Sequence, residues 1–123
     1  MTLGEALDRF DLLYPNAMEP ALKTALVSRL EGRLQAEIFS LYAEGNGAFA
    51  GYDAVDDRNT ALLAPFPFDD IYIKFLCAEN DLICGDTERY RNSAAVFNSA
   101  FEAMAAYYNR TRRIGKQVRL RAE

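Results

Sequence analysis

The sequence contains no histidine and only two cysteines. Without histidine, the chain has neither a Ser–His–Asp or Cys–His catalytic arrangement nor a histidine-ligated metal site. Two cysteines alone do not complete a structural zinc site, which takes four ligands. Gly45, Gly47 and Gly51 lack the final glycine or the Lys-Ser/Thr pair of a phosphate-binding loop. These absences argue against an enzyme, a metal centre and a bound cofactor.

Long hydrophobic runs are also missing. No apolar stretch approaches the roughly 20 residues that span a bilayer, and the N-terminal residues lack the basic-then-apolar pattern of a signal peptide. Cys77 and Cys84 lie in a helical pattern about 10 Å apart along the axis, beyond the roughly 7 Å between Cα atoms that a disulfide allows. We therefore expect a soluble, intracellular protein with reduced thiols.

The 123 residues are half apolar, enough for one domain with a single core. Charge is divided unevenly along the chain. Residues 1–109 carry 17 acidic and 8 basic side chains, a net charge of −9, whereas residues 110–123 carry six basic side chains and one acidic one, a net charge of +5. Asymmetry of this kind indicates an interaction tail on an acidic body.

Two helices are expected in the first third of the chain. Residues 2–5, Thr-Leu-Gly-Glu, fit a capping box that opens a short helix, and Pro15 stops it. A second helix opens at Glu19-Pro20 and ends at residues 44–47, Glu-Gly-Asn-Gly. The predicted apolar face of the first helix comprises Leu3, Leu7, Phe10 and Leu13. That of the second comprises Leu22, Leu26, Leu30, Leu34, Ile38 and Leu41.

Two further helices are expected between residue 69 and residue 109. Asp69 or Asp70 caps the third helix, Gly85 breaks it, and Asp86 caps the fourth. The third helix carries Ile71, Phe75, Leu76, Leu82 and Ile83 on its apolar side. The fourth carries a heptad-like seam of Tyr90, Ala94, Phe97, Phe101, Met104 and Tyr108. This seam predicts antiparallel packing of the last two helices, and it favours a core or subunit interface over a stacking platform for bases.

Residues 45–67 have no helical period, several glycines and two prolines. We interpret them as a long loop or arm that projects from the helical body, with Phe49 and Tyr52 as candidate partner-binding residues because no helical face accommodates them. Asp53, Asp56 and Asp57 miss the ligand spacing of a calcium loop, so a solvated loop is favoured over a cation site.

The basic tail, residues 110–123, has three interpretations. It is a solvated chain end, a nucleic-acid arm that neutralises phosphates, or an assembly arm that lies on the acidic body of a neighbouring subunit. Charge complementarity between tail and body favours the third for a homo-oligomer. The candidate partner-binding residues of the tail are Arg110, Arg112, Arg113, Lys116, Arg119 and Arg121.

Several stretches together resemble the head–tail connector (adaptor, or head-completion) proteins of phages and prophages of Gram-positive bacteria. They are LLYPNA at residues 12–17, LEGRLQAEI at 30–38, ERYRNSAAVFNSAFEAMAAYYNRT at 88–111, and the basic end. The resemblance implies a helical adaptor that forms a ring beneath the portal, contacts the next neck or tail protein, and surrounds the channel through which DNA passes. It also implies synthesis in the host cytoplasm, a place in the virion neck, and no enzymatic residues. At residues 18–20, Met-Glu-Pro replaces the Ser-Asp type of cap usual in the family.

The sequence therefore predicts an all-α protein of about four helices. Residues 1–109 form the helical domain, with the long loop at 45–67, and residues 110–123 form an extended basic arm. The leading functional hypothesis is a structural phage neck protein that oligomerises without a cofactor, metal or membrane. The alternative is a small helical nucleic-acid-binding or regulatory protein that uses the basic tail.

Overall fold

The computed structural model describes residues 1–38 and 51–111, which form four α-helices and no extended strand. The elements are α1 (Leu3–Leu13), α2 (Pro20–Glu37), the short 3-10 helix η2 (Phe68–Asp70), α3 (Ile71–Ile83) and α4 (Thr87–Thr111). The all-α class and the long connection between α2 and α3 are confirmed. The expected C-terminal arm, residues 112–123, lies outside the described residues.

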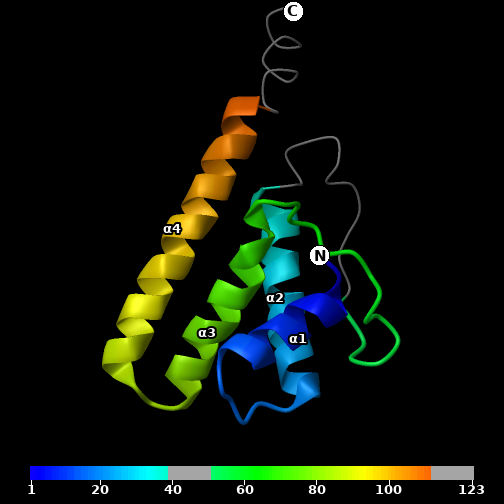
Figure 1. The fold of residues 1–123 in the computed structure, drawn as a ribbon. Coiled ribbons are helices and arrows are strands. Elements are labelled where there is room, and N and C mark those ends of the chain that lie inside the picture. Colours follow the sequence, from blue (N-terminus) through cyan, green and yellow to red (C-terminus); the bar gives the residue numbers. More distant parts are fainter. Residues whose placement is uncertain (39–50, 112–123) are drawn as a thin grey trace, which may run out of the picture.

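The third α-helix is the centre of the arrangement, because α1, α2 and α4 all pack against it. Figure 1 shows α3 and α4 as an antiparallel pair joined by a tight turn, with α1 crossing in front of α2 and α3. The long helix α4 lies on the outside of this group. None of the described helices is long and apolar enough to cross a membrane.

Local sequence signals fix several helix ends. At the start of α1, the backbone N–H of Thr2 donates to Glu5 (2.9 Å) and the N–H of Glu5 donates to the Thr2 hydroxyl (3.2 Å), which confirms the capping box. The hydrogen bonds from Thr2 lower the pKa of the Glu5 carboxyl. Asp86 caps α4 by accepting from the Arg89 N–H at 3.0 Å. Gly85 before it has φ +75°, a conformation that favours glycine.

Helices α2 and α3 also begin where the sequence predicts, but without a side-chain cap. Pro20 occupies the first turn of α2 after Glu19, and neither Glu19 nor Asp70 makes a side-chain capping hydrogen bond. Asp70 instead pairs with Lys74, four residues later on α3, at 3.0 Å.

The aromatic seam of α4 faces the core. Phe97, Phe101, Met104 and Tyr108 are buried, and Tyr90 and Ala94 are partly buried. The Phe97 ring lies 5.1 Å from the Phe75 ring of α3 and 5.9 Å from the Phe101 ring, distances typical of favourable aromatic pairs. The core interpretation of this seam is confirmed, and these rings are not available to stack on bases.

The predicted apolar face of α2 is wrong at its start. Leu26, Leu30, Leu34 and Ile38 are buried, but Leu22 is 39% exposed. Repeated steps of four residues advance about 40° beyond a full turn each time, so a stripe with this spacing drifts off one face of a helix. The helix also ends at Glu37, before the predicted stop at residues 44–47; those residues, and Leu41, lie outside the described part of the chain.

Three other residues assigned to apolar faces are exposed: Leu13 at the end of α1, and Leu82 and Ile83 at the end of α3. Each lies in the last turn of its helix, where the neighbouring helices no longer cover all sides. Both cysteines are free thiols, as expected. Partial burial raises the pKa of Cys77.

The interpretation of residues 45–67 as a projecting arm is wrong for residues 51–64, which lie against the helices. The N–H groups of Leu3 and Gly4 donate to the carbonyls of Thr60 (2.9 Å) and Arg58 (2.8 Å), and the Leu62 N–H donates to the Met1 carbonyl at 3.0 Å. Leu62 and Ala64 are buried in the core. The N-terminal residues supply backbone partners that a loop without periodicity otherwise lacks.

We predict that Phe97→Ala lowers the free energy of unfolding by about 3–5 kcal/mol, because it leaves a cavity between α3 and α4. Val96→Ala is the matched control, since Val96 is 51% exposed on the same helix, and it should cost less than about 1 kcal/mol. Urea unfolding followed by circular dichroism measures both. Equal losses in the two variants would contradict the assignment of Phe97 to the core.

We predict that Gly4→Ala destabilises the protein by about 1–3 kcal/mol, although alanine ordinarily favours a helix by about 1 kcal/mol over glycine. A Cβ at residue 4 would lie 2.9 Å from the Arg58 carbonyl oxygen, a backbone atom that cannot rotate away. Asn92→Ala, on the exposed side of α4, should instead be neutral or slightly stabilising. Thermal melting of both variants tests the sign, and a raised Tm for Gly4→Ala would refute the close approach.

Candidate functional site

The structure describes two of the eight residues predicted to bind a partner. Arg110 is exposed in the last turn of α4, where it is free to meet a partner. Tyr52 is partly buried at the start of residues 51–64, which lie against the helices and which we call the returning segment. The remaining candidates, Phe49, Arg112, Arg113, Lys116, Arg119 and Arg121, lie outside the described residues.

Tyr52 points into the protein. Its backbone N–H donates to the Ser28 hydroxyl at 2.9 Å, and its phenolic hydroxyl donates to the Glu31 carboxylate at 2.6 Å. Both partners lie on α2. The structure therefore gives Tyr52 an internal task, which is to hold the returning segment on α2, and contact with a partner stays a prediction.

Glu31 is the centre of a buried polar cluster. Its side chain has no exposed surface, and it accepts from the Tyr52 hydroxyl, from the Leu63 N–H at 3.0 Å and from the Tyr72 hydroxyl. Tyr72 in turn accepts from the Ala64 N–H at 2.9 Å. We call Glu31, Tyr52 and Tyr72 the Glu31 cluster. It joins α2, the returning segment and α3 at one point.

Burial shifts the pKa values within the Glu31 cluster. Desolvation raises the pKa of Glu31, and the donated hydrogen bonds from Tyr52, Tyr72 and Leu63 only partly oppose this effect. Burial and the nearby carboxylate raise the pKa of both tyrosines well above the ordinary value for a phenol. The tyrosines therefore stay protonated and serve as donors at physiological pH.

A perturbed carboxyl group often marks a functional site, but the Glu31 cluster lacks access. Because Glu31 is fully enclosed, no ligand reaches it without the returning segment moving. Its role is positional. The sequence analysis overlooked Glu31 because it defined the apolar face of α2 by its leucines. The face that is buried follows steps that alternate between three and four residues, at Thr24, Val27, Glu31, Leu34 and Ile38.

The acidic cluster at Asp53, Asp56 and Asp57 shapes a turn. Asp53 accepts from the N–H groups of Val55 and Asp56, both at 2.9 Å, and these bonds lower its pKa. Asp57 accepts from the Asp53 N–H at 2.6 Å. Within residues 1–38 and 51–111, no group of three or more His, Cys, Asp or Glu side chains is placed to hold a metal ion.

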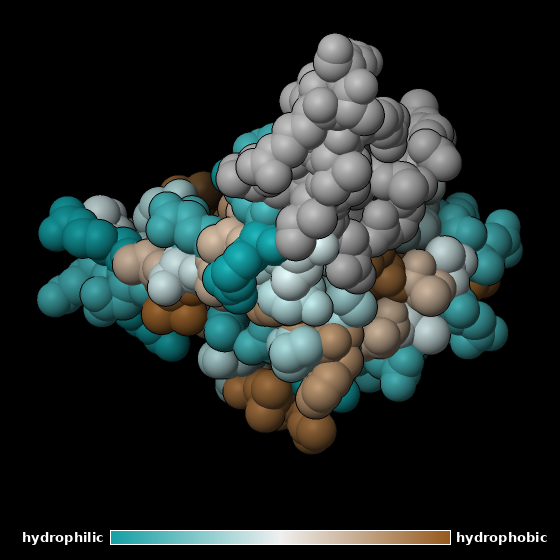
Figure 2. Space-filling model, turned by 90° about the horizontal axis from the view of Figure 1, so that it is seen from above, coloured by the Kyte–Doolittle hydropathy of each residue, from teal (hydrophilic) through white to brown (hydrophobic). Residues whose placement is uncertain are grey.

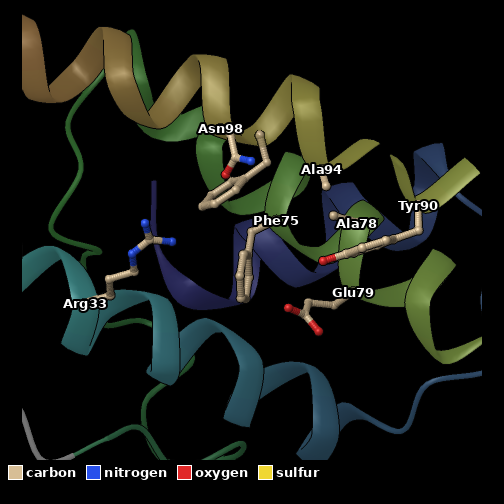
Figure 3. Close-up of a pocket in the computed structure, with 8 residues that line it drawn as sticks. Arg33, Phe75, Ala78, Glu79, Tyr90, Ala94 and Asn98 are labelled. Carbon is tan, nitrogen blue, oxygen red and sulfur yellow. The ribbon is translucent and has the colours of Figure 1, made fainter. Parts of the chain in front are cut away.

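An open groove lies where α2, α3 and α4 meet (Figure 3). We call it the three-helix groove, and its volume is about 150 Å³. Its lining is mainly polar, with groups from Arg33, Glu79, Tyr90 and Asn98 on the three helices; the nearly buried rings of Phe75 and Phe97 also border it. In Figure 3 the Glu79 carboxylate and the Tyr90 hydroxyl both point into the space between α2 and α4.

Arg33 is held at the rim of the three-helix groove. Its Nε lies 2.6 Å from a Glu37 carboxylate oxygen, one turn further along α2. Its guanidinium carbon lies 4.2 Å from the centre of the Phe101 ring, within the range of a cation–π contact. The charge of Arg33 is therefore already compensated by Glu37.

A second hollow adjoins the three-helix groove at the turn between α3 and α4. This turn hollow has a volume of about 280 Å³ and shares Tyr90 with the groove. Asp81, Leu82 and Asp86 also line it. The turn hollow has a mainly apolar lining with a few charged groups, which is the general form of a binding site. The three-helix groove lies below the roughly 300 Å³ typical of small-molecule pockets, which suits side chains of a protein segment better than a metabolite.

The chain was compared with protein families, curated proteins and solved structures. No protein-family model, curated protein or solved structure matches the chain.

We predict that Glu31 makes stability fall as pH rises. A carboxyl group with a raised pKa in the folded protein contributes most below its unfolded pKa of about 4.5, and the contribution disappears as pH rises through the folded pKa. The free energy of unfolding of the wild type, measured against Glu31→Gln by urea titration, should therefore decline from pH 4 to pH 8. A pKa that is higher by one in the folded than in the unfolded protein changes the free energy of unfolding by about 1.4 kcal/mol over this range. A constant or growing difference would contradict the raised pKa.

Proposed function

We propose that this chain is a structural component of a phage neck, a head–tail connector that assembles with copies of itself between portal and tail proteins. The observation that carries the proposal is the division of charge. An acidic body of net charge −9 is followed by a tail of net charge +5 within one short chain. Opposite charges on two parts of a protein steer identical copies into register.

The all-α body is compatible with this function. The resemblance to connector proteins rests on residues 12–17, 30–38 and 88–111, which fall at the end of α1, in α2 and along α4. Arg110 begins the basic stretch on the exposed last turn of α4, so the tail leaves from an outer helix (Figure 1). An acidic surface beside passing DNA also keeps the DNA from adhering.

Exposed apolar side chains give such a protein contacts for assembly. Leu12 is 84% exposed, and Phe66 is 85% exposed between two prolines. In the view of Figure 2 the hydrophobic surface forms separate patches on a largely hydrophilic surface. Small patches suit contacts that form on assembly more than one large permanent interface.

The second candidate is a nucleic-acid-binding or regulatory protein. Six basic side chains in residues 110–123 favour it, since lysine and arginine neutralise phosphates. The acidic body opposes it, and the aromatic rings of Phe97 and Phe101 are buried, which removes them as base-stacking surfaces.

We predict that the protein forms a complex with a candidate portal protein, that this complex has a larger mass than the protein alone, and that its formation depends on the tail. Light scattering after size exclusion should show an assembly for the intact chain, and deletion of residues 112–123 should weaken it while the helicity stays nearly unchanged. Each exposed ion pair contributes only about 0.2–1 kcal/mol, so several act together and raised salt should imitate the deletion.

The matched control keeps the tail length and removes its charge, with Arg112, Arg113, Lys116, Arg119 and Arg121 all replaced by glutamine. This variant should assemble as poorly as the deletion. If the intact chain instead binds duplex DNA with a steep salt dependence and ignores the portal, the second candidate is correct.

A further inference from the structure

The three-helix groove and the turn hollow form one acidic surface that the fold leaves open, and its apolar part lies in the turn hollow. We propose that this surface binds residues 116–121 from the basic arm of a second copy of the chain. The inference rests on the proposed assembly function and names the surface through which neighbouring copies join.

Charge is the first argument for this occupant. Glu79, Asp81 and Asp86 line the two hollows, against the single cation Arg33, which Glu37 already pairs at 2.6 Å. The Asp81 carboxylate accepts from the Ser93 hydroxyl and the Asp86 carboxylate from the Arg89 backbone N–H, and both donors are neutral. The surface therefore keeps a negative charge that complements the arm.

Sequence pattern and length are the second argument. Residues 116–121 read Lys-Gln-Val-Arg-Leu-Arg, so apolar and basic side chains alternate. In an extended segment Val118 and Leu120 share one side and face the mainly apolar lining of the turn hollow, where Leu82 is exposed, while the long arginine side chains reach carboxylates at the rim. The surface extends along α4 from Thr87 to Asn98, about 16 Å, and six extended residues span about 20 Å.

Reach favours a second copy as the donor. The last residue of α4, Thr111, lies about 20 Å along the helix from Asn98, the near end of the groove. The five residues from Thr111 to Lys116 span at most about 18 Å even when fully extended. An arm that doubled back along its own helix would bring only its last residues, from Val118 on, to the near end of the groove, whereas the arm of a neighbour can lie along the surface with all of residues 116–121.

Photo-cross-linking of the full-length chain tests the proposal. The variant Leu120→p-benzoylphenylalanine, prepared in ¹⁴N and ¹⁵N forms and mixed, is irradiated and digested with trypsin. Cross-links should join the arm to the tryptic peptides 75–89 and 92–110, which contain residues lining the two hollows, and should pair ¹⁴N with ¹⁵N peptides. Pairing of the two isotopes identifies donors and acceptors on different copies.

A second substitution separates the groove from general charge attraction. Glu79→Gln in the same background should lower the cross-link yield about two- to fivefold, the size expected for one exposed ion pair. Glu102→Gln, exposed on α4 and outside both hollows, should leave the yield unchanged. Cross-links within one chain, cross-links to other peptides, or equal effects of the two variants overturn the proposal. Any of these results beside an intact portal-dependent mass gain leaves the connector function in place.

Discussion

The rest of the structure depends on a buried carboxylate. Glu31 has no exposed surface, and two tyrosine hydroxyls and a backbone N–H satisfy it. A buried polar group without partners costs roughly 1–3 kcal/mol, so the donors and the acceptor need one another. The donors come from α3 and from the returning segment. All hydrogen bonds to Glu31 therefore form only when both elements lie in their native positions beside α2. Together with the backbone bonds to the N-terminal residues, these contacts fix residues 51–64 on the helices.

This arrangement explains why the outer helix is free for other contacts. The Glu31 cluster and the crossing helix α1 lie on the α2 and α3 side, and α4 contributes one face to the core through its aromatic seam. The other face of α4 carries polar and small residues, and the edge between the two faces lines the groove. The polar residues of the groove, such as Glu79 and Asn98, lie outside the buried core, so a change at either leaves the core packing intact.

Much of the fold is predictable because it follows from short-range rules. The capping box at residues 2–5, the Gly85-Asp86 break and the seam of Phe97, Phe101, Met104 and Tyr108 each depend on neighbours within one or two helical turns. The groove and the Glu31 cluster depend on residues far apart in sequence. A glutamate among leucines resembles a solvated residue until its partners are known. Likewise, a segment with glycines and prolines resembles a free arm until the N-terminal backbone is placed beside it.

The separation of these contacts along the chain also bears on the order of folding. A turn of only three residues connects α3 and α4, so their pairing costs little loop entropy. The contacts of Glu31 with Tyr52, Leu63 and Tyr72 span 21, 32 and 41 residues. Because closing a long loop costs more entropy, we expect the α3–α4 hairpin to form first and the returning segment to dock last. On that order, weakening the Glu31 cluster would speed unfolding more than it slows folding, so the contact that forms last would set the lifetime of the native chain.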